Sequence, residues 1–230
     1  MKLRIRFEKT GSMKFIGHLD TMRFFQKLMR LADIDIRYSE GFSPHPVMSF
    51  ALPLGVGVES IGEYLDLEVH TTGPSEDSLQ RLNACMPEGL RVLSYKKLPD
   101  NAKNGMSMVA AADYLITPKR GTMPDLSDEV QTLFHDAPAF VIEKKTKKSV
   151  KELDLKQHVY AFRCRQNGFF LKLAAGSETN IKPELLLEAF FERAGMTFEK
   201  KDWQITRLEL YGKNDAGGFC PLDDFGENLC

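Results

Sequence analysis

The chain has 230 residues, of which 43% are hydrophobic, so it can bury a sizeable core and has room for one large or two small domains. Its 31 basic residues nearly balance its 32 acidic ones, which excludes the overall cationic field that drives non-specific binding to nucleic acids. Contact with a nucleic acid would therefore have to come from local patches of charge.

The cysteines and the apolar runs exclude further classes of protein. The 4 cysteines lie far apart, with no CxxC pair and no Cys/His cluster at the spacing of zinc ligands. Residues 1–7 alternate basic and apolar side chains and lack the apolar stretch of a signal peptide. No run approaches the roughly 18 consecutive apolar residues of a transmembrane helix. We therefore expect a soluble cytoplasmic protein with reduced thiols, without a metal or cofactor and without membrane contact.

In the first half of the chain, apolar residues recur with the periods of strands and helices. Leu3, Ile5 and Phe7 alternate with basic neighbours, which predicts a half-buried strand. Over residues 18–31, apolar residues three and four apart predict a helix, and Asp20 in its first turn suits the helix dipole. The other predictions are strands at 34–38, 64–69 and 90–98, a buried segment at 47–52 and a helix at 74–86. This order is the ferredoxin-like βαββαβ pattern.

The second half repeats the pattern. Asn167-Gly168 between two strand-like runs is a strong hairpin signal, and Gly195 marks the end of a helix. The predicted elements are strands at 114–117, 140–143, 159–165, 169–174 and 203–211, and helices at 126–134 and 183–194. We therefore predict an α+β protein of two tandem ferredoxin-like units, with the following boundaries: a first unit at 1–99, a polar linker at 100–112, a second unit at 113–212 and a loose tail at 213–230.

The least ordinary stretch is residues 38–46, Tyr-Ser-Glu-Gly-Phe-Ser-Pro-His-Pro. Pro44 and Pro46 fix their own backbone and push the preceding residues towards extended conformations, while Gly41 permits a sharp turn. His45 is thereby held in place, as a binding or catalytic imidazole would be, although a rigid surface turn has the same composition. We expect a recognition edge, with these binding candidates besides His45: Asp20, Arg23, Ser39, Gly41, Phe42, Ser43, Glu59, Ser60 and Glu63.

His18 and His45 are also candidates for acid–base catalysis. Histidine changes its charge near neutral pH, and nearby carboxylates such as Glu59 and Glu63 would complete an acid–base site if they converged. The alternative is that His18 caps a helix and His45 decorates a turn. Because no ligand-spacing motif occurs, we predict no metal site.

A run of lysines in the second half is a candidate for contact with nucleic acid. Solvated lysines in a hairpin loop are common, and contacts to phosphates carry no sequence information, so the run supports RNA binding only weakly. Its members are Lys144, Lys145, Lys147, Lys148 and Lys151.

The first predicted sheet lacks the features of an RNA-binding surface. In ferredoxin-like topology the first strand lies beside the third, so Arg4 and Arg6 would face Asp66 and Glu68 and their charges would largely cancel. The aromatic residues that stack RNA bases are also missing from its open face, where only Tyr64 is expected. We therefore expect a salt-bridged sheet there.

Nucleophilic catalysis has little support, because the chain contains no GxSxG motif and no glycine loop that cradles phosphate. At the level of fold alone, two ferredoxin-like units with a histidine resemble the repeat-RNA endoribonucleases of CRISPR systems. The glycine-rich loop that marks those enzymes is missing, since residues 175–177 (Ala-Gly-Ser) are a poor substitute.

Several blocks of the chain resemble the radical-SAM-linked protein family, a bacterial family. In the first half, the resemblance is carried, in the same order, by residues 15–20 (Phe-Ile-Gly-His-Leu-Asp), 38–46, 53–60 (Pro-Leu-Gly-Val-Gly-Val-Glu-Ser) and 63–66 (Glu-Tyr-Leu-Asp). The second half is similar more loosely, through residues 150–155 (Val-Lys-Glu-Leu-Asp-Leu) and 180–185 (Asn-Ile-Lys-Pro-Glu-Leu).

The resemblance implies a partner more than an activity. Members of that family occur next to, or fused behind, cobalamin-binding radical SAM proteins, and often near genes for ribosomal proteins and RNA processing. This chain has no CxxxCxxC motif for an iron–sulfur cluster, so a partner would supply the radical chemistry. We expect an accessory protein that binds RNA or a partner such as this radical SAM enzyme, with RNA or ribosome modification as its setting. The alternative is an RNA-processing enzyme that uses His45 or His18.

Overall fold

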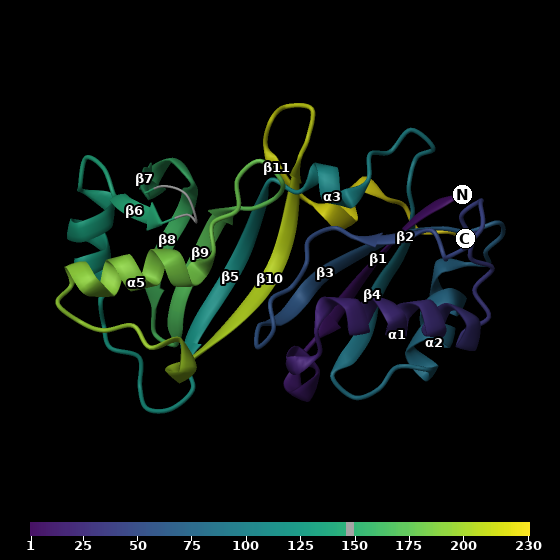
Figure 1. The fold of residues 1–230 in the computed structure, drawn as a ribbon, viewed down its shortest axis with the longest axis horizontal. Coiled ribbons are helices and arrows are strands. Elements are labelled where there is room, and N and C mark those ends of the chain that lie inside the picture. The colour runs from purple at the N-terminus through teal and green to yellow at the C-terminus, as the bar shows by residue number, and fades with distance from the viewer. Residues whose placement is uncertain (146–149) are drawn as a thin grey trace. The chain divides into compact units, whose positions relative to one another are not determined.

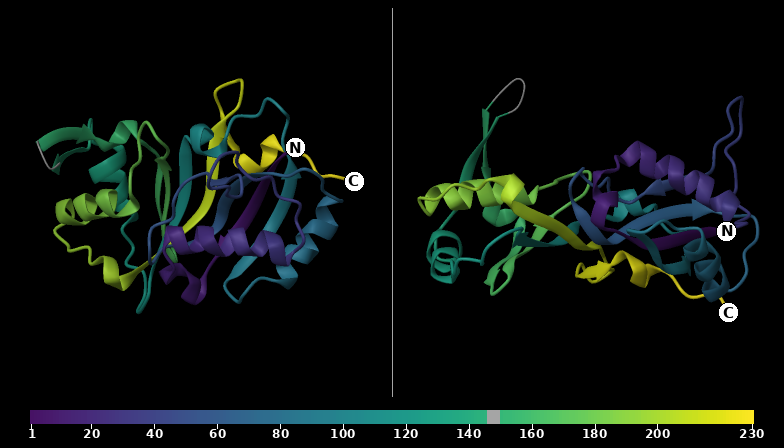
Figure 2. Two further views of the ribbon diagram at one scale, coloured as in Figure 1. Left: turned by 45° about the vertical axis from the view of Figure 1, so that its right-hand side comes forward. Right: turned by 90° about the horizontal axis from the view of Figure 1, so that it is seen from below.

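The computed structural model describes residues 1–145 and 150–230, which divide into two compact units (Figures 1 and 2). Unit 1 comprises residues 1–110 and 207–230, and unit 2 comprises residues 111–206. Strand β10 (Trp203–Lys213) begins in unit 2 and ends in unit 1. These boundaries differ from the expected ones because residues 100–110 and 213–230 fold as parts of unit 1.

Unit 1 combines a sheet with two full helices. Its elements are β1 (Lys2–Lys9), α1 (His18–Leu31), β2 (Met48–Phe50), β3 (Glu59–Glu68), α2 (Ser75–Ala84), β4 (Leu90–Lys97), α3 (Gly105–Met108) and β11 (Phe219–Pro221), with 3-10 turns η1 (Gly11–Phe15) and η5 (Leu222–Phe225). The strand order is β4-β1-β3-β10, where β2 also pairs with β3 and β11 with β10.

Helix α1 has the predicted bounds and covers one face of this sheet. It begins after Gly17, carries Asp20 in its first turn, and is followed by a turn in which Asp33 has a φ of 51°. Its apolar side buries Phe25, whose ring centroid lies 4.7 Å from that of Phe7 on β1. The alternation in β1 thus places its apolar residues under the helix, as predicted.

The predicted strand at 34–38 is replaced by isolated bridges. Ile36 pairs with Val69 and Tyr38 with Pro46, while β2 forms further along the chain, against the end of β3. Since Pro46 has no N–H, the 38–46 segment cannot continue as a regular ladder and closes instead as a hairpin loop.

Unit 2 is also built from strands and a few helices. Its elements are β5 (Ala111–Pro118), α4 (Ser127–Glu129), a π-helical turn η2 (Val130–His135), β6 (Val141–Lys145), β7 (Val150–Asp154), β8 (Val159–Arg165), β9 (Gly168–Ala174), α5 (Pro183–Arg193) and the start of β10, with 3-10 turns η3 (Leu155–Gln157) and η4 (Lys200–Asp202). The strand order is β10-β5-β9-β8, and β6 and β7 form a separate two-stranded sheet. The mixture of sheets and few helices is consistent with the predicted α+β class.

The core of unit 2 is rich in phenylalanine. Phe162 on β8 and Phe169 on β9 contact Phe190 of α5, with ring centroids 5.0 Å and 6.0 Å away. Phe134 of η2 lies 5.3 Å from Phe162 on the same side. The β8–β9 hairpin turns at Gln166 and Asn167, which confirms the turn predicted from Asn-Gly.

The tail predicted to be loose is instead packed onto unit 1. Leu222 is fully buried, and the backbone N–H of Leu229 donates to Ser75 Oγ at 2.8 Å. Residues 100–110, expected as a linker, contain α3, whose first residue Gly105 donates its N–H to Asp66 at 2.6 Å. Both segments were misjudged because polar and glycine-rich composition also suits a covering segment whose hydrogen-bond partners are distant in sequence.

Candidate functional site

The loop at residues 38–46 is an ordered hairpin. Tyr38 and Pro46 form a β-bridge, and the N–H of Ser39 donates to the carbonyl of His45 at 2.8 Å. Gly41 has a φ of +111°, a conformation that L-residues rarely adopt, which lets the chain reverse at the tip. The glycine and the two prolines therefore produce a fixed turn, as the sequence predicted.

His45 is held by contacts on one side of its ring. Its Nδ1 lies 2.9 Å from Ser39 Oγ and 3.3 Å from the carbonyl oxygen of Ser43. Its backbone N–H donates to Ser39 Oγ at 3.1 Å. Among the described residues, every ring hydrogen bond of His45 uses Nδ1, so Nε2 is the nitrogen left for a ligand.

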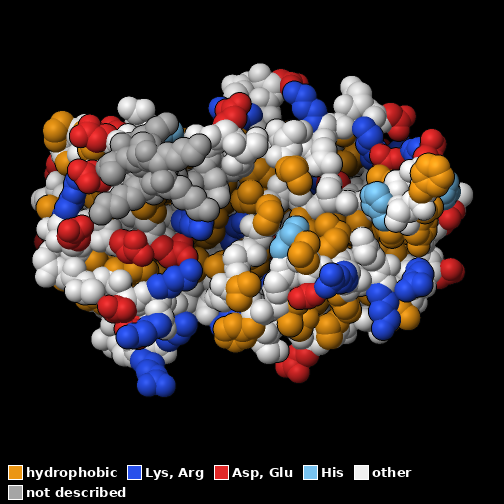
Figure 3. All heavy atoms as spheres, in the orientation of Figure 1, with side chains coloured by type: hydrophobic (Ala, Val, Ile, Leu, Met, Phe, Trp, Pro, Cys, Tyr) orange, Lys and Arg blue, Asp and Glu red, His pale blue; other side chains and the backbone are white. Residues whose placement is uncertain are grey.

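Phe42 stands at the tip of this loop in full contact with solvent. Its relative exposure is 112%, the largest among the exposed hydrophobic residues in the described part of the chain. Tyr38 at the base of the loop is 43% exposed. Further hydrophobic side chains reach the surface on the face of unit 1 that carries α1 (Figure 3). An aromatic side chain on a rigid turn loses little conformational entropy when a partner covers it, so Phe42 is well suited to binding.

A cleft of about 410 Å³ opens beside the loop. Its size falls in the range of small-molecule sites and also suits side chains of a docked protein. Polar contacts shape its rim: Asn104 Nδ2 donates to Ser49 Oγ at 2.8 Å, and Lys2 Nζ donates to the carbonyl of Ala102 at 3.1 Å. The lining residues come from β1, the 38–46 loop, β2, β3 and the segment before α3: Lys2, Leu3, Ser39, His45, Pro46, Val47, Met48, Ser49, Asp66, Leu67, Glu68, Leu98, Ala102, Lys103 and Asn104.

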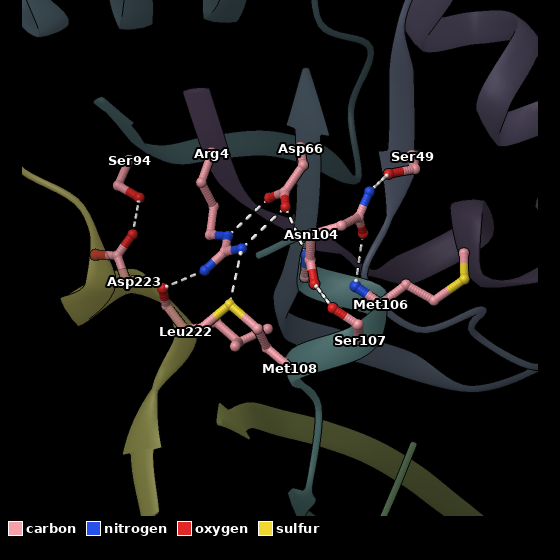
Figure 4. A network of polar contacts seen from close by, with 11 residues as sticks. Arg4, Ser49, Asp66, Ser94, Asn104, Met106, Ser107, Met108, Leu222 and Asp223 are labelled. Carbon is pink, nitrogen blue, oxygen red and sulfur yellow. Dashed lines mark hydrogen bonds and ion pairs between the residues drawn. The ribbon is translucent and has the colours of Figure 1, made fainter. Parts of the chain in front are cut away.

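A buried ion pair fixes one wall of the cleft (Figure 4). Arg4 and Asp66 lie opposite each other on β1 and β3, and Arg4 Nε and Nη2 donate to the two Asp66 oxygens at 2.7 Å and 2.9 Å. Arg4 is fully buried because α3 and η5 cover this face, and its Nη1 donates to the carbonyl of Leu222 at 3.0 Å. The predicted pairing of Arg4 with Asp66 is confirmed, but the face is covered rather than open.

Arg6 and Glu68, the second predicted pair, each pair with another residue. Arg6 pairs with Glu209 of β10 at 2.9 Å, and Glu68 pairs with Arg37 at 2.9 Å. Tyr64, expected on an open face, is buried and donates its hydroxyl to Glu209 at 2.6 Å. Burial and the neighbouring carboxylate raise the pKa of Tyr64, and burial raises the pKa of Glu209 despite the hydrogen bond from Tyr64.

His18 and Glu63 belong to a separate, much smaller cavity of about 20 Å³. Glu63 is buried and accepts hydrogen bonds from Arg207 Nε at 2.7 Å and Nη2 at 2.5 Å. Lys9 also lines this cavity, and its burial lowers the pKa of its amine, an effect that Glu63 partly offsets. The His18 ring packs against Phe50, with centroids 5.2 Å apart.

The remaining candidates on the first unit are also separate. Glu59 pairs with Lys14 at 2.9 Å, whereas Ser60 Oγ donates to the carbonyl of Arg207 at 3.0 Å. Asp20 and Arg23 form an exposed pair at 3.0 Å on α1. The predicted candidates therefore form no common cleft, and within the described ranges no group of three or more His, Cys, Asp or Glu side chains could hold a metal ion.

The lysine candidates cannot be assigned a surface. Lys147 and Lys148 lie outside the described residues, and so do the side chains of Lys144, Lys145 and Lys151, whose backbone belongs to β6 and β7.

Several residues of the site could not be predicted from the sequence. Asn104 and Ser49 at the cleft rim and Arg207 beneath Glu63 had no local signal. Each meets its partner only through long-range contacts, since the residue numbers of Asn104 and Ser49 differ by 55 and those of Arg207 and Glu63 by 144.

Comparison with known proteins gives a family and no activity. A family model described as "Uncharacterized protein conserved in bacteria (DUF2344)" matches residues 2–183. No curated protein matches the chain. None of the helices in residues 1–145 and 150–230 combines the length and the apolar character needed to cross a membrane. The description of the family names no radical SAM protein, so that link stays a prediction. Since the matched residues cover most of the sequence, the chain belongs to this conserved bacterial family.

Proposed function

We propose that this protein is a cytoplasmic accessory protein that binds a partner protein through the 38–46 loop and the adjoining cleft. The partner implied by the sequence resemblance is a cobalamin-binding radical SAM enzyme, and RNA or ribosome modification is the implied setting. The observation that carries the proposal is the complete exposure of Phe42 on a turn that is fixed by the Ser39–His45 contacts. A rigid, exposed aromatic beside a cleft has the properties of an interface anchor.

The charge of the loop favours a protein over RNA as the ligand of this surface. Glu40 is the single charged residue among residues 38–46, and it is acidic. A loop that contacts phosphates would carry lysine or arginine. The neighbouring Arg37 is already paired with Glu68.

A catalytic role for the histidines has less support. His45 lines the larger cleft and His18 the smaller cavity, so they do not form an acid and base acting on one substrate. His45, which is oriented by Ser39, or His18 would then act singly in the alternative of RNA processing.

We also propose that the two units are ferredoxin-like. In unit 1 the elements β1, α1, β2, β3, α2 and β4 follow the βαββαβ order, and the strand order is β4-β1-β3-β2. In unit 2 the corresponding strands β5, β8, β9 and β10 have the order β10-β5-β9-β8, with α4 and η2 after the first and α5 between the last two. The β6–β7 hairpin would then be an insertion.

The binding proposal is tested by co-purification with the neighbouring radical SAM enzyme. Phe42→Ser should weaken the complex about tenfold or more, the scale of an interface hot spot. Phe15→Ser is the matched control, because Phe15 is also exposed, at 64%, but lies far from the loop in sequence. An enzyme that fails to bind the wild type, or that binds Phe42→Ser as tightly as the control, would contradict the proposal.

The alternative is tested by incubating the pure protein with total RNA from the same cells. Metal-independent cleavage that disappears in His45→Ala or His18→Ala would establish RNA processing. Intact RNA under all conditions would exclude it.

A further inference from the structure

The helices of unit 2 pack on one face of its sheet and not on the other. Phe162 and Phe169 contact Phe190 of α5, and Phe162 also contacts Phe134 of η2, so both helical segments pack on the same face of the sheet. Figure 1 shows α5 running across β8 and β9. Side chains alternate along a strand, so the neighbours of these residues on β8 and β9 belong to the opposite face.

An aromatic residue lies at the centre of this opposite face. Phe170 is on β9, between β5 and β8, and its partners in register are Leu115 on β5 and Arg163 on β8. Arg165, also on β8, places its guanidinium 4.7 Å from the centre of the Phe170 ring. Arg163 and Arg165 are exposed, whereas Phe170 and Leu115 are half-buried.

The charge of this face is positive. Lys172 follows Phe170 on the same side of β9 and lies 3.6 Å from Asp113 on β5. With Arg163 and Arg165, three cations thus stand against one carboxylate. On β10, Ile205 is buried, so its neighbours Gln204 and Thr206 belong to the opposite face, and both are uncharged.

We propose that this face of unit 2 binds single-stranded RNA. An unpaired base can stack on the Phe170 ring and on the guanidinium planes beside it, while Arg163 and Arg165 contact the flanking phosphates. A duplex cannot do the same, because its bases are stacked within the helix. Stacking on an aromatic ring and contacts to phosphates are available to every base, so the binding is sequence-tolerant.

The corresponding face of unit 1 differs. There the arginine nearest the centre, Arg4, is bonded to Asp66 and covered by α3 and η5. The two sheets therefore have different surfaces, of which the one in unit 2 combines an aromatic with exposed arginines.

The inference goes beyond the proposed function and does not rest on it. The RNA surface involves residues of unit 2, whereas the partner loop belongs to unit 1. A failure of RNA binding would leave co-purification through Phe42 unaffected, and the reverse is also true.

The test measures binding of the full-length protein to a fluorescein-labelled, unstructured RNA 12-mer by anisotropy. Phe170→Leu keeps an apolar side chain in place but removes the ring, and it should raise the Kd about tenfold. The double variant Arg163→Gln/Arg165→Gln should raise the Kd and should also lower the slope of log Kd against log salt by about 1.4, the value for two lost phosphate contacts to a single strand.

Matched controls are available in unit 1. Phe15→Leu removes an exposed ring, and Arg30→Gln/Arg91→Gln removes two exposed arginines, without touching this face. Circular dichroism of each variant establishes that it is folded. The proposal is supported if only the unit 2 variants lose affinity. It is overturned if the wild type does not bind at low salt, if a duplex of the same length binds as well, or if both sets of variants behave alike.

Discussion

Ser39 contacts His45 through two hydrogen bonds of one hydroxyl group. Its Oγ lies 2.9 Å from His45 Nδ1 and accepts a hydrogen bond from the backbone N–H of His45 at 3.1 Å. A single side chain thereby joins the two arms of the loop that carries Phe42, and it does so six residues away in sequence. The orientation of the imidazole and the closure of the loop therefore depend on the same group.

Replacing Ser39 by Ala should loosen this loop without unfolding the protein. One neutral hydrogen bond contributes about 1 kcal/mol, so exchange of the His45 amide hydrogen should become about fivefold faster. Hydrogen exchange measured by NMR would detect it. Ser43→Ala is the control, because the contact of Ser43 with His45 uses the backbone carbonyl. Equal exchange in the two variants would show that the hydroxyl of Ser39 does not hold the loop.

The buried pair of Glu63 and Arg207 should be essential for the stability of unit 1. Both side chains are at most 4% exposed, so Glu63→Ala removes the carboxylate that balances the charge of a buried arginine. We expect a loss of about 3–5 kcal/mol in the free energy of unfolding, measured with urea. The exposed pair of Asp20 and Arg23 provides the comparison, since Asp20→Ala should leave the stability nearly unchanged. Similar losses in both variants would contradict the assigned burial.

Tyr64 should make the protein less stable at alkaline pH. Its pKa in the folded state is raised above the ordinary value of 10.0, first by burial and then by Glu209, so the unfolded chain loses this proton first as the pH rises. Its contribution to stability is therefore complete below pH 10.0 and declines above it, by about 1.4 kcal/mol for each pH unit.

The variant Tyr64→Phe should remove this slope. In this variant, the free energy of unfolding measured between pH 9 and 11 should fall less steeply with pH than in the wild type. The difference in slope should approach that of one proton, about 1.4 kcal/mol for each pH unit. Lys9 acts in the opposite sense, because its lowered pKa makes its contribution grow as the pH rises towards 10.5, but it does so equally in both proteins. Identical slopes would mean that Tyr64 is not buried as described.

Gly62 should not tolerate a side chain. A Cβ atom at this position would lie 2.4 Å from the carbonyl oxygen of Leu208, so β3 and β10 would have to separate. Gly62→Ala should cost about 3 kcal/mol, the upper range for overpacking. Gly73→Ala is the control, because its Cβ would meet no atom within 4 Å. Equal melting temperatures for the two variants would rule out the close approach.

Patterns of apolar residues and turn residues predicted those helices, strands and turns that depend on neighbouring residues. The spacing of apolar residues gave α1 its bounds, Asn167-Gly168 located the β8–β9 turn, and Arg4 was correctly placed opposite Asp66. These features depend on neighbours in sequence or on the register of one strand pair.

Features that depend on distant residues were missed. The segment around Asn104 and Gly105 has the composition of a linker, and partners distant in sequence, such as Asp66 and Ser49, make it a covering element. Likewise, proline and glycine located the 38–46 loop, but no local signal showed that His18 and His45 line different cavities. The aromatic face around Phe170 was missed because its positive charge arises from residues on adjacent strands.

The discontinuity of unit 1 has a consequence for synthesis of the protein. Its residues 207–230 follow the whole of unit 2, and they supply Arg207 for Glu63 and Leu222 for Arg4. During translation, residues 1–110 leave the ribosome long before these partners emerge. While unit 2 can already fold, Glu63 therefore lacks Arg207, and Arg4 keeps Asp66 but lacks the carbonyl of Leu222. The nascent first unit is therefore the part of the chain most exposed to chaperones and proteases, although it is translated first.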